Sequence, residues 1–399
     1  MSRRKPLPPG IALLLLLLLV LVSLSCGPAG LGVNFTGWAG PVVVDDAVYL
    51  ASKKGADRAS VRALSAFDGN EQGRFTPTVK LEAIYGTPVV EGNTLYTTSV
   101  YQSNGTEFGR VYAVDVNSLV TAWEFPPLGR DDMGPVFGGV AFSPDTSTIY
   151  VGSADGKLYA LDASDGTPKR GAGGVVFDAK SPIWGAPVVD KGIVYFGTMG
   201  GTLFGVNEGG GKAFEFRVGG AIAATPLVKD GVVYVGSFDK KFYAIVPGIN
   251  KPKWTFSGDN WFWGEAILAQ VPGTGDIIFV GSLDGKVYAL NAGSGNPVWL
   301  QPFQTGQGIR AGPVLANRTS FSGPFANVTD QVLVVGSRDG MVYGLDPISG
   351  KLAWKEPFDA GGRVLAPPTA VNNIIYVSNT DHDLFALDAE TGTLMTAFP

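Results

Sequence analysis

The stretch Tyr159-Ala160-Leu161-Asp162 decides the fold, because variants of it return seven more times along the 399 residues. Each copy has an aromatic residue, then Ala or Gly, then an aliphatic residue, and usually Asp or Asn. Neighbouring copies lie 39 to 55 residues apart. An array with this period is typical of propeller blades, which take about 40 to 50 residues each. The other copies are Ser65-Ala66-Phe67-Asp68 in degenerate form, Tyr112-Ala113-Val114-Asp115, Phe204-Gly205-Val206-Asn207, Tyr243-Ala244-Ile245-Val246, Tyr288-Ala289-Leu290-Asn291, Tyr343-Gly344-Leu345-Asp346 and Phe385-Ala386-Leu387-Asp388.

Within one repeat, residues 183–216, short apolar runs alternate with Gly, Asp and Lys. Runs of this length between turn residues indicate strands joined by tight hairpins. The sequence therefore predicts an all-β fold, an eight-bladed β-propeller of four-stranded antiparallel blades. Asp-Gly pairs at 155–156, 284–285 and 339–340 predict two-residue type I′ turns, which need positive φ angles.

The second position of the repeated stretch is always small. Residues 66, 113, 160, 205, 244, 289, 344 and 386 are all Ala or Gly. Sheets stacked face to face need small residues where large side chains of the neighbouring blade must fit. This column therefore indicates packing between blades and gives no information on chemistry.

Four repeats carry a tryptophan eight positions after the Asp column, at Trp123, Trp254, Trp299 and Trp354. With Gly-Leu-Asp-Pro-Ile-Ser-Gly-Lys-Leu-Ala-Trp at 344–354, the chain resembles the pyrroloquinoline-quinone-like repeat over essentially all of 36–399. The resemblance implies that these tryptophans dock blade against blade. Arg170, Glu215 and Thr396 replace the tryptophan in other repeats, so the girdle should be incomplete.

The N-terminus reads as a secretory signal. Arg3, Arg4 and Lys5 precede an uncharged apolar run over 11–24 that ends at Ser25-Cys26-Gly27. This resembles a lipoprotein signal. The resemblance implies that cleavage before Cys26 makes it the first residue of the mature chain, and that Cys26 is acylated. An ordinary signal peptide with a spare cysteine and an uncleaved anchor remain alternatives. We expect a signal peptide over 1–26, a tether over 27–35 and the propeller over 36–399.

Charge and cysteine content limit the partners. Removing 1–26 leaves 27 Lys and Arg against 35 Asp and Glu, so the mature surface is acidic and nucleic acid is not expected as a partner. Cys26 is the only cysteine, which excludes an intrachain disulfide.

A lipid-anchored protein made almost entirely of this repeat resembles the propeller lipoproteins of the bacterial outer-membrane barrel assembly machine. The resemblance implies a monomeric, non-catalytic scaffold outside the cytoplasm, held to a membrane by its lipid and presenting its rim to an envelope protein. No motif for gripping that partner can be located, so none is assigned.

The repeat is named after quinone-dependent dehydrogenases, so an enzyme using pyrroloquinoline quinone (PQQ) is the alternative. The resemblance implies that such enzymes hold the quinone under a disulfide of adjacent cysteines, near a calcium ion and a catalytic aspartate. With one cysteine and no concentrated carboxylate cluster, the sequence leads us to expect no cofactor and no catalytic residue.

One further column is a candidate binding site. Three residues before the position that usually holds Pro, in the first strand of each repeat, stand Trp38, Tyr85, Phe137, Trp184, Ala223, Trp263, Arg310 and Leu365. The first strand lies nearest the propeller axis, so these side chains either ring one mouth of the channel or fill gaps between blades. A ring of aromatic residues with one Arg would suit a peptide, a glycan or a planar ligand. Trp261-Phe262-Trp263 is the best candidate for an exposed recognition loop.

The remaining polar features predict no metal site and two loop extensions. Asp381-His382-Asp383 holds the only histidine, but its alignment with 155–157 makes it a hairpin turn. Insertions at 101–109 and 317–330 are predicted as polar loop extensions. Such loops either bind partners or are neutral length variation.

Overall fold

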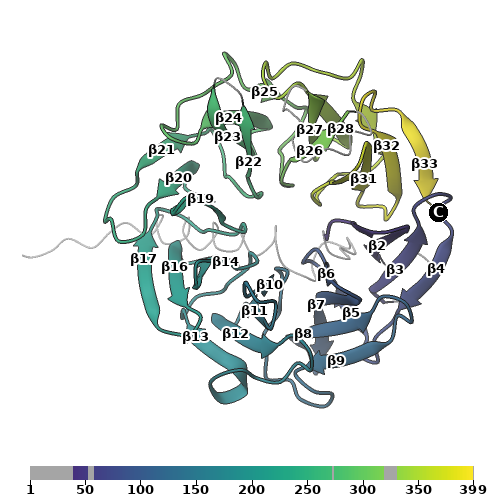
Figure 1. The fold of residues 1–399 in the computed structure, drawn as a ribbon, viewed down its shortest axis with the longest axis vertical. Coiled ribbons are helices and arrows are strands. Elements are labelled where there is room, and N and C mark those ends of the chain that lie inside the picture. The colour runs from purple at the N-terminus through teal and green to yellow at the C-terminus, as the bar shows by residue number, and fades with distance from the viewer. Residues whose placement is uncertain (1–38, 53–57, 272–273, 319–329, 399) are drawn as a thin grey trace, which may run out of the picture. The chain divides into compact units, whose positions relative to one another are not determined.

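The computed structural model describes residues 39–52, 58–271, 274–318 and 330–398. The chain divides into Met1–Phe35 and Thr36–Pro399. Cys26, the predicted tether and Trp38 lie outside the described residues. In Thr36–Pro399, eight antiparallel sheets follow one another in a ring (Figure 1). The predicted all-β, eight-bladed propeller is confirmed.

The first four blades follow chain order. They consist of β1 (Val42–Val44), β2 (Ala47–Ser52), β3 (Ser60–Ser65) and β4 (Glu71–Phe75); β5 (Leu81–Ala83), β6 (Val89–Glu91), β7 (Thr94–Ser103), β8 (Thr106–Asp115) and β9 (Thr121–Phe125); β10 (Ala141–Phe142), β11 (Thr148–Gly152), β12 (Lys157–Asp162) and β13 (Val175–Asp178); and β14 (Val188–Asp190), β15 (Ile193–Gly197), β16 (Thr202–Asn207) and β17 (Lys212–Arg217).

The last four blades repeat the same order. They consist of β18 (Leu227–Lys229), β19 (Val232–Gly236), β20 (Lys241–Ile245) and β21 (Trp254–Ser257); β22 (Ile267–Val271), β23 (Gly275–Gly281), β24 (Lys286–Asn291) and β25 (Phe303–Gln304); β26 (Val314–Asn317), β27 (Gln331–Gly336), β28 (Met341–Leu345) and β29 (Phe358–Asp359); and β30 (Thr369–Val371), β31 (Ile374–Ser378), β32 (Leu384–Asp388) and β33 (Leu394–Phe398). Among the described residues the only helical element is the short 3-10 turn η1 (Ala172–Gly174), and none forms a helix with the length and apolar character of a membrane span.

The ring closes by packing between the first and last blades. Each of these two blades is built from consecutive strands, so no strand is exchanged across the closure. Val48 and Leu50 of β2 share a buried cluster with Tyr376 of β31 and Phe398 of β33. The Thr369 hydroxyl also donates a hydrogen bond to the carbonyl oxygen of Pro41. Apolar burial therefore joins the two ends of the propeller.

The register of the first blade corrects the sequence prediction. Tyr49 of β2 pairs with Ala63 of β3, as Tyr96 pairs with Ala113 in the second blade. The first copy of the repeat is therefore Arg62-Ala63-Leu64-Ser65, three residues before the predicted Ser65–Asp68. The side chain of Phe67 is 75% exposed. With Ala63 in place of Ala66, the second position of the repeated stretch is still Ala or Gly in every copy.

Ser65 takes the place of the Asp column in the turn, which explains why the first copy was placed three residues too late. Its hydroxyl oxygen accepts hydrogen bonds from the backbone N–H groups of Phe67 and Asp68, at 3.3 and 3.5 Å. Asp115 accepts the equivalent bonds through its carboxylate in the second blade. A serine can cap this turn, although more weakly than an aspartate.

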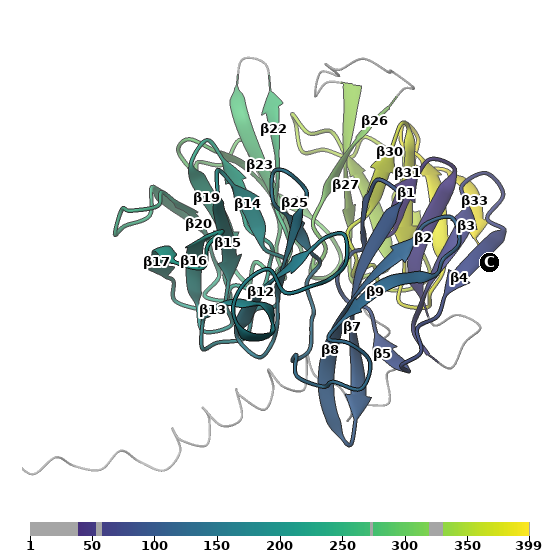
Figure 2. The same cartoon turned by 60° about the horizontal axis from the view of Figure 1, so that its bottom comes forward.

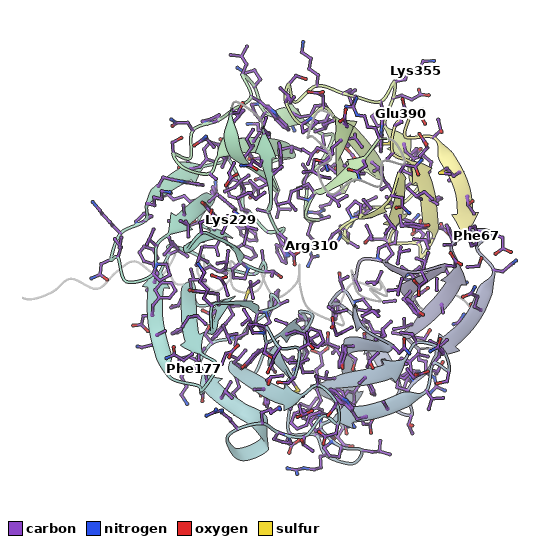
Figure 3. All side chains as sticks on the ribbon, viewed as in Figure 1. Phe67, Phe177, Lys229, Arg310, Lys355 and Glu390 are labelled. Carbon is purple, nitrogen blue, oxygen red and sulfur yellow. The ribbon has the colours of Figure 1, made fainter. Side chains whose placement is uncertain are left out.

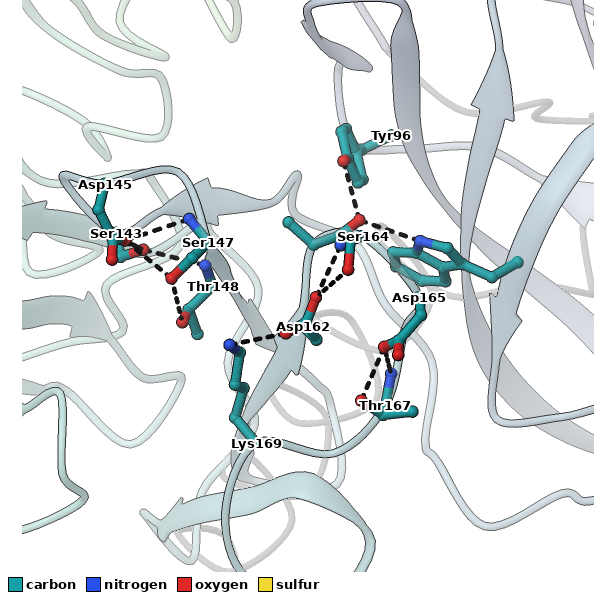
Figure 4. Close-up of polar contacts among 12 residues, drawn as sticks. Tyr96, Ser143, Asp145, Ser147, Thr148, Asp162, Ser164, Asp165, Thr167 and Lys169 are labelled. Atoms are coloured by element: carbon teal, nitrogen blue, oxygen red, sulfur yellow. Dashed lines mark hydrogen bonds and ion pairs between the residues drawn. The ribbon is translucent and has the colours of Figure 1, made fainter.

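The predicted tryptophan girdle docks each of its blades against the next one. The indole N–H groups of Trp123, Trp254, Trp299 and Trp354 donate to backbone carbonyls of the following blade at 2.9 to 3.0 Å. Figure 4 shows this arrangement beside Asp162, where Tyr96 donates to the same carbonyl, that of Ala163, as Trp123 does. Hydrogen bonds from Lys169 and Ser164 lower the pKa of Asp162 to about 2.

The turns between the second and third strands differ from the predicted type. In Asp155-Gly156 only the glycine has positive φ, at 85°, and Ser153 pairs with Lys157 across a three-residue loop. This pattern is a type I turn followed by a glycine bulge, so the type I′ prediction is wrong here. The freed Asp155 carboxylate accepts hydrogen bonds from the Tyr159 hydroxyl at 2.6 Å and from the Lys157 N–H at 3.0 Å.

The same bond recurs in the blades that carry Asp239, Asp284 and Asp339, each with the tyrosine four residues later. Desolvation, with a further contribution from the bonded carboxylate, raises the pKa of Tyr343 to about 12. The tyrosines at the aromatic position of the repeat therefore also donate a hydrogen bond to the carboxylate in the preceding turn.

The insertion at 101–109 is an extended β-hairpin, so the prediction of a loop is corrected. β7 and β8 pair over ten residues each and end in a turn at Asn104-Gly105, whose φ angles are 51° and 78°. These angles fit the type I′ turn that Asn-Gly favours. Figure 2 shows the hairpin extending beyond the neighbouring strands. Of the second insertion, residues 319–329 lie outside the described part of the chain.

Candidate functional site

The predicted ligand column lies in the four-residue segments that precede the innermost strands, which we call the inner segments. Seven of its eight residues belong to the described chain, and all seven line one cavity of about 370 Å³. They are Tyr85, Phe137, Trp184, Ala223, Trp263, Arg310 and Leu365. Seven successive blades thus bring together side chains spread over 280 residues of sequence.

The residue that follows each member of the ligand column is small, and this allows neighbouring inner segments to pack closely. A Cβ atom on Gly86 would lie 2.4 Å from the carbonyl oxygen of Gly138, and one on Gly138 would lie 2.6 Å from the nitrogen of Ala186. The equivalent positions around the ring are Ala39, Gly86, Gly138, Gly185, Ala224, Gly264, Ala311 and Ala366. This second column of Ala and Gly was a usable sequence signal for the cavity wall, and the sequence analysis missed it.

Four column residues form a continuous aromatic arc: Tyr85, Phe137, Trp184 and Trp263. The ring centroids are 5.2 Å apart for Tyr85 and Phe137, and 5.0 Å apart for Phe137 and Trp184. Trp184 and Trp263 approach to 6.3 Å, although Ala223 stands between them in the column. The small Ala223 side chain leaves room for this contact. Tilted and edge-to-face pairs at these distances are favourable.

Arg310 follows the arc and places the guanidinium carbon 4.2 Å from the centroid of the Trp263 ring. Figure 3 places Arg310 at the central opening. A guanidinium over an indole face is held by a cation–π interaction and still presents N–H donors at its edge. The geometry fixes a positive charge at the end of the aromatic arc.

Glu265 is the other charged residue among the described residues that line the cavity. Its carboxylate accepts a hydrogen bond of 2.6 Å from the Thr225 hydroxyl of the neighbouring inner segment. Desolvation by the surrounding wall raises the pKa of the Glu265 carboxyl, and the bond from Thr225 opposes this rise. The cavity therefore holds one fixed cation and one carboxyl group with an elevated pKa.

Trp261 lies outside the cavity and extends the aromatic surface. Its ring stacks on Phe238 at 4.5 Å with an interplanar angle of 6°, and Phe238 lies 4.7 Å from Trp263. Phe262 between the two tryptophans is fully buried. The predicted recognition loop is therefore a platform of two partly exposed tryptophans separated by a core residue.

The projecting hairpin is a second surface that differs from the repeat. Arg110 of β8 is buried, and its Nη1 donates to the Pro126 carbonyl at 2.7 Å and lies 3.1 Å from Glu124 Oε1. Its Nη2 donates to the Tyr101 hydroxyl at 3.3 Å, and that hydroxyl donates to Asp131 at 2.6 Å. This network ties the hairpin to the connection leaving the blade. The exposed tip residues are Gln102, Asn104, Gly105 and Thr106.

The described residues contain no cluster of side chains suited to a metal ion. No set of three or more His, Cys, Asp and Glu side chains there is placed to hold a metal ion. His382 lies in a turn with φ of 67° and donates its backbone N–H to the Asn379 carbonyl. The turn assignment of Asp381-His382-Asp383 is therefore correct.

Comparison with protein families gives one match over the repeats. The profile described as "Outer membrane protein assembly factor BamB" matches residues 171–261 and 284–395. A curated relative with the same description, from Nitrosomonas eutropha, is 27% identical over 112 residues. That alignment spans 28% of this chain and about a quarter (26%) of the relative's length.

Solved structures share the fold at low identity. BamB from Moraxella catarrhalis has a TM-score of 0.58 at 18% identity, over 78% of this chain and 84% of that one. The quinohemoprotein alcohol dehydrogenase from Comamonas testosteroni has a TM-score of 0.59 at 18% identity, over 79% and 67%. The computationally designed Ika8 protein reaches 0.60 at 16% identity, over 92% and 98%. Likeness at this level shows the propeller fold and does not separate scaffold from enzyme.

Proposed function

The chain belongs to the family described as outer membrane protein assembly factor BamB, and from this premise we propose that it is a non-catalytic scaffold for assembling outer-membrane proteins. It works outside the cytoplasm, anchored to a membrane through an acylated Cys26. Its activity is binding: the rigid wheel holds an envelope protein partner at its rim. The single observation that carries this proposal is the family match across residues 171–261 and 284–395.

The rival function is a PQQ-dependent dehydrogenase, since two quinohemoprotein alcohol dehydrogenases share the fold. The residues present do not fit that cofactor. Among the described residues that line the cavity, Glu265 is the only carboxylate, and no neighbouring cysteines exist in a chain with one cysteine. A calcium ion prefers six to eight oxygen ligands, and no set of three or more His, Cys, Asp and Glu side chains among the described residues is placed to hold a metal ion. We therefore derive no catalytic step.

The partner surface that we assign to the scaffold is the β7–β8 hairpin. It is the largest departure from the repeat among the described residues, its tip is exposed, and the buried Arg110 network holds it rigidly. Rigid projections bind partners with little loss of conformational entropy. Connecting segments on a rigid scaffold are where proteins of one fold carry their specific contacts.

The test is in-cell photo-crosslinking of the full chain, with the crosslinker placed at Asn104 on the hairpin tip. Asn117 is the matched control, because it is an exposed asparagine in the turn that follows the opposite end of β8. We expect a defined crosslink to an envelope protein at position 104, identified by mass spectrometry, and none at position 117. Equal crosslinking at both positions, or none at position 104, would contradict the assigned surface.

A further inference from the structure

Trp261 is an aromatic residue at a position where five other blades have none. In the third to eighth blades, the residue two positions before the ligand column accepts, through its carbonyl oxygen, a backbone N–H from the turn between the second and third strands. This bond identifies the equivalent residues, which besides Trp261 are Pro135, Pro182, Ala221, Gly308 and Arg363. Five blades are built without an aromatic ring here, so packing of the propeller does not account for Trp261.

Phe238, on which Trp261 stacks, departs from the repeat in the same way. The same turn position in the other five blades holds Ala154, Met199, Leu283, Arg338 and Thr380. The Phe238 and Trp261 rings are 4.5 Å apart with 6° between their planes, and both side chains are partly exposed. Two neighbouring blades therefore place aromatic residues at facing positions where the repeat uses none. Exposed aromatic groups that the fold does not need indicate a binding surface.

The indole of Trp261 keeps groups that other tryptophans use within the protein. In the described part of the chain Phe238 is the only ring that contacts it, and its Nε1 has no hydrogen-bond acceptor. Trp263 differs, because Trp184 and Arg310 already contact its ring. The girdle tryptophans differ as well, because their indole N–H groups donate to backbone carbonyls. Trp261 therefore retains ring surface and a hydrogen-bond donor for a ligand.

Polar side chains accompany this ring. Asp259 is 75% exposed, and Lys286 bonds to its Oδ2 alone, so Oδ1 remains an acceptor. Lys286 lowers the pKa of Asp259 most and the exposed Lys240 lowers it further, which places both ammonium groups near this carboxylate. Asn260 fixes the loop, because its Oδ1 accepts the backbone N–H of Trp261 at 2.9 Å. The surface is thus a positioned ring with donors and an acceptor at its side.

We propose that this surface binds a glycan: a pyranose ring stacks its C–H face on the indole of Trp261, and its hydroxyls bond to the indole N–H, to Asp259 and to Lys240. Pyranoses with equatorial substituents, as in chains of β-1,4-linked glucose or N-acetylglucosamine, have a flat apolar face and a polar edge. Both features have their counterparts in this surface. The inference goes beyond the proposed function and does not depend on it.

A protein partner fits this surface less well. The aromatic residues that dominate protein interfaces lie at the centre of well-packed patches of about 800 Å² per partner, from which water is excluded. None of the exposed large apolar side chains of the described chain lies in 238–241 or 259–263. The charged Asp259 and Lys240 lie there instead. An apolar partner would desolvate these charges without a compensating bond, whereas sugar hydroxyls bond to them.

The test is isothermal titration calorimetry of the full mature chain with cellotetraose and with tetra-N-acetylchitotetraose, and we expect one or both to bind. Trp261→Ala should weaken binding at least about tenfold, because both the stacked ring and its N–H are lost. Trp261→Phe, which keeps a ring without the N–H, should lose less. Alanine already occupies the equivalent position at Ala221, so Trp261→Ala is expected to fold.

Phe67→Ala is the matched control, because Phe67 is an aromatic side chain that is 75% exposed in the turn after β3 (Figure 3). It should leave glycan binding unchanged. Asp259→Ala provides a second binding variant on an exposed side chain, and it should weaken both tetrasaccharides.

Three outcomes would overturn the proposal. The first is that neither tetrasaccharide binds to the folded chain, and the second is that Trp261→Ala binds as tightly as Phe67→Ala. The third is that a photo-crosslinker at position 261 captures a defined protein in cells while no glycan binds, which would make this surface a protein interface. All three leave the hairpin crosslink at position 104 intact, so they are distinguishable from failure of the scaffold function.

Discussion

Replacing Trp354 by alanine is expected to lower the free energy of unfolding by about 3–5 kcal/mol, the range for deleting a buried tryptophan. Its side chain is buried between the seventh and eighth blades, against Gly344 and Gly392. The substitution also leaves the Ala389 carbonyl without the indole N–H that lies 3.0 Å away. The loss acts on the docking of two blades and therefore on the integrity of the ring.

Equilibrium urea unfolding of the purified chain measures this effect. Leu300→Ala is the control, because Leu300 is 95% exposed and should change stability by no more than about 0.5 kcal/mol. A Trp354→Ala protein as stable as the control would mean that the girdle does not hold the blades together.

Replacing Arg110 by methionine is expected to cost about 3–5 kcal/mol, the range for removing one partner of a buried charge pair. Methionine approximates the length of the side chain but cannot donate to the Pro126 carbonyl or the Tyr101 hydroxyl. Glu124 then loses its charge partner. Because the network ties down the hairpin, amide hydrogen exchange should accelerate in β7 and β8 before it does so elsewhere.

Lys212→Met is the matched control for this charge. Lys212 pairs with Glu215 at 3.0 Å on the surface, where such pairs contribute about 0–1 kcal/mol. If Arg110→Met and Lys212→Met have equal effects, the buried network does not stabilise the hairpin. An unchanged exchange pattern in β7 and β8 would lead to the same conclusion.

The repeat predicted the fold because its signal comes from packing that every blade shares. The Ala/Gly position and the tryptophans pack at the interfaces between neighbouring blades. The small residue therefore recurs in all eight repeats and the tryptophan in four. The first copy was placed three residues late because Arg62 stands at the aromatic position and Ser65 at the Asp position. The nearby Ala66-Phe67-Asp68 resembles the other copies of the repeat more closely, although it is not the equivalent segment.

The site depends on features that occur once. The sequence placed the aromatic column near the axis, but the contact of Trp184 with Trp263 requires the small Ala223 and the curvature of a closed ring. The cation–π contact of Arg310 joins two blades whose inner segments lie 47 residues apart. Local patterns do not encode such geometry. The turn type likewise depended on hydrogen bonds from Tyr159 and its equivalents, which the Asp-Gly pair alone does not reveal.

The central claim is that the chain supports the assembly of outer-membrane proteins, and the most direct measurement is the amount of those proteins in cells that lack it. Quantitative mass spectrometry of isolated outer membranes should show β-barrel proteins reduced several-fold, while soluble periplasmic proteins stay constant. Expression of the wild-type chain should restore them. Unchanged β-barrel levels, together with loss of a dye-linked dehydrogenase activity, would contradict the scaffold function and favour the enzyme.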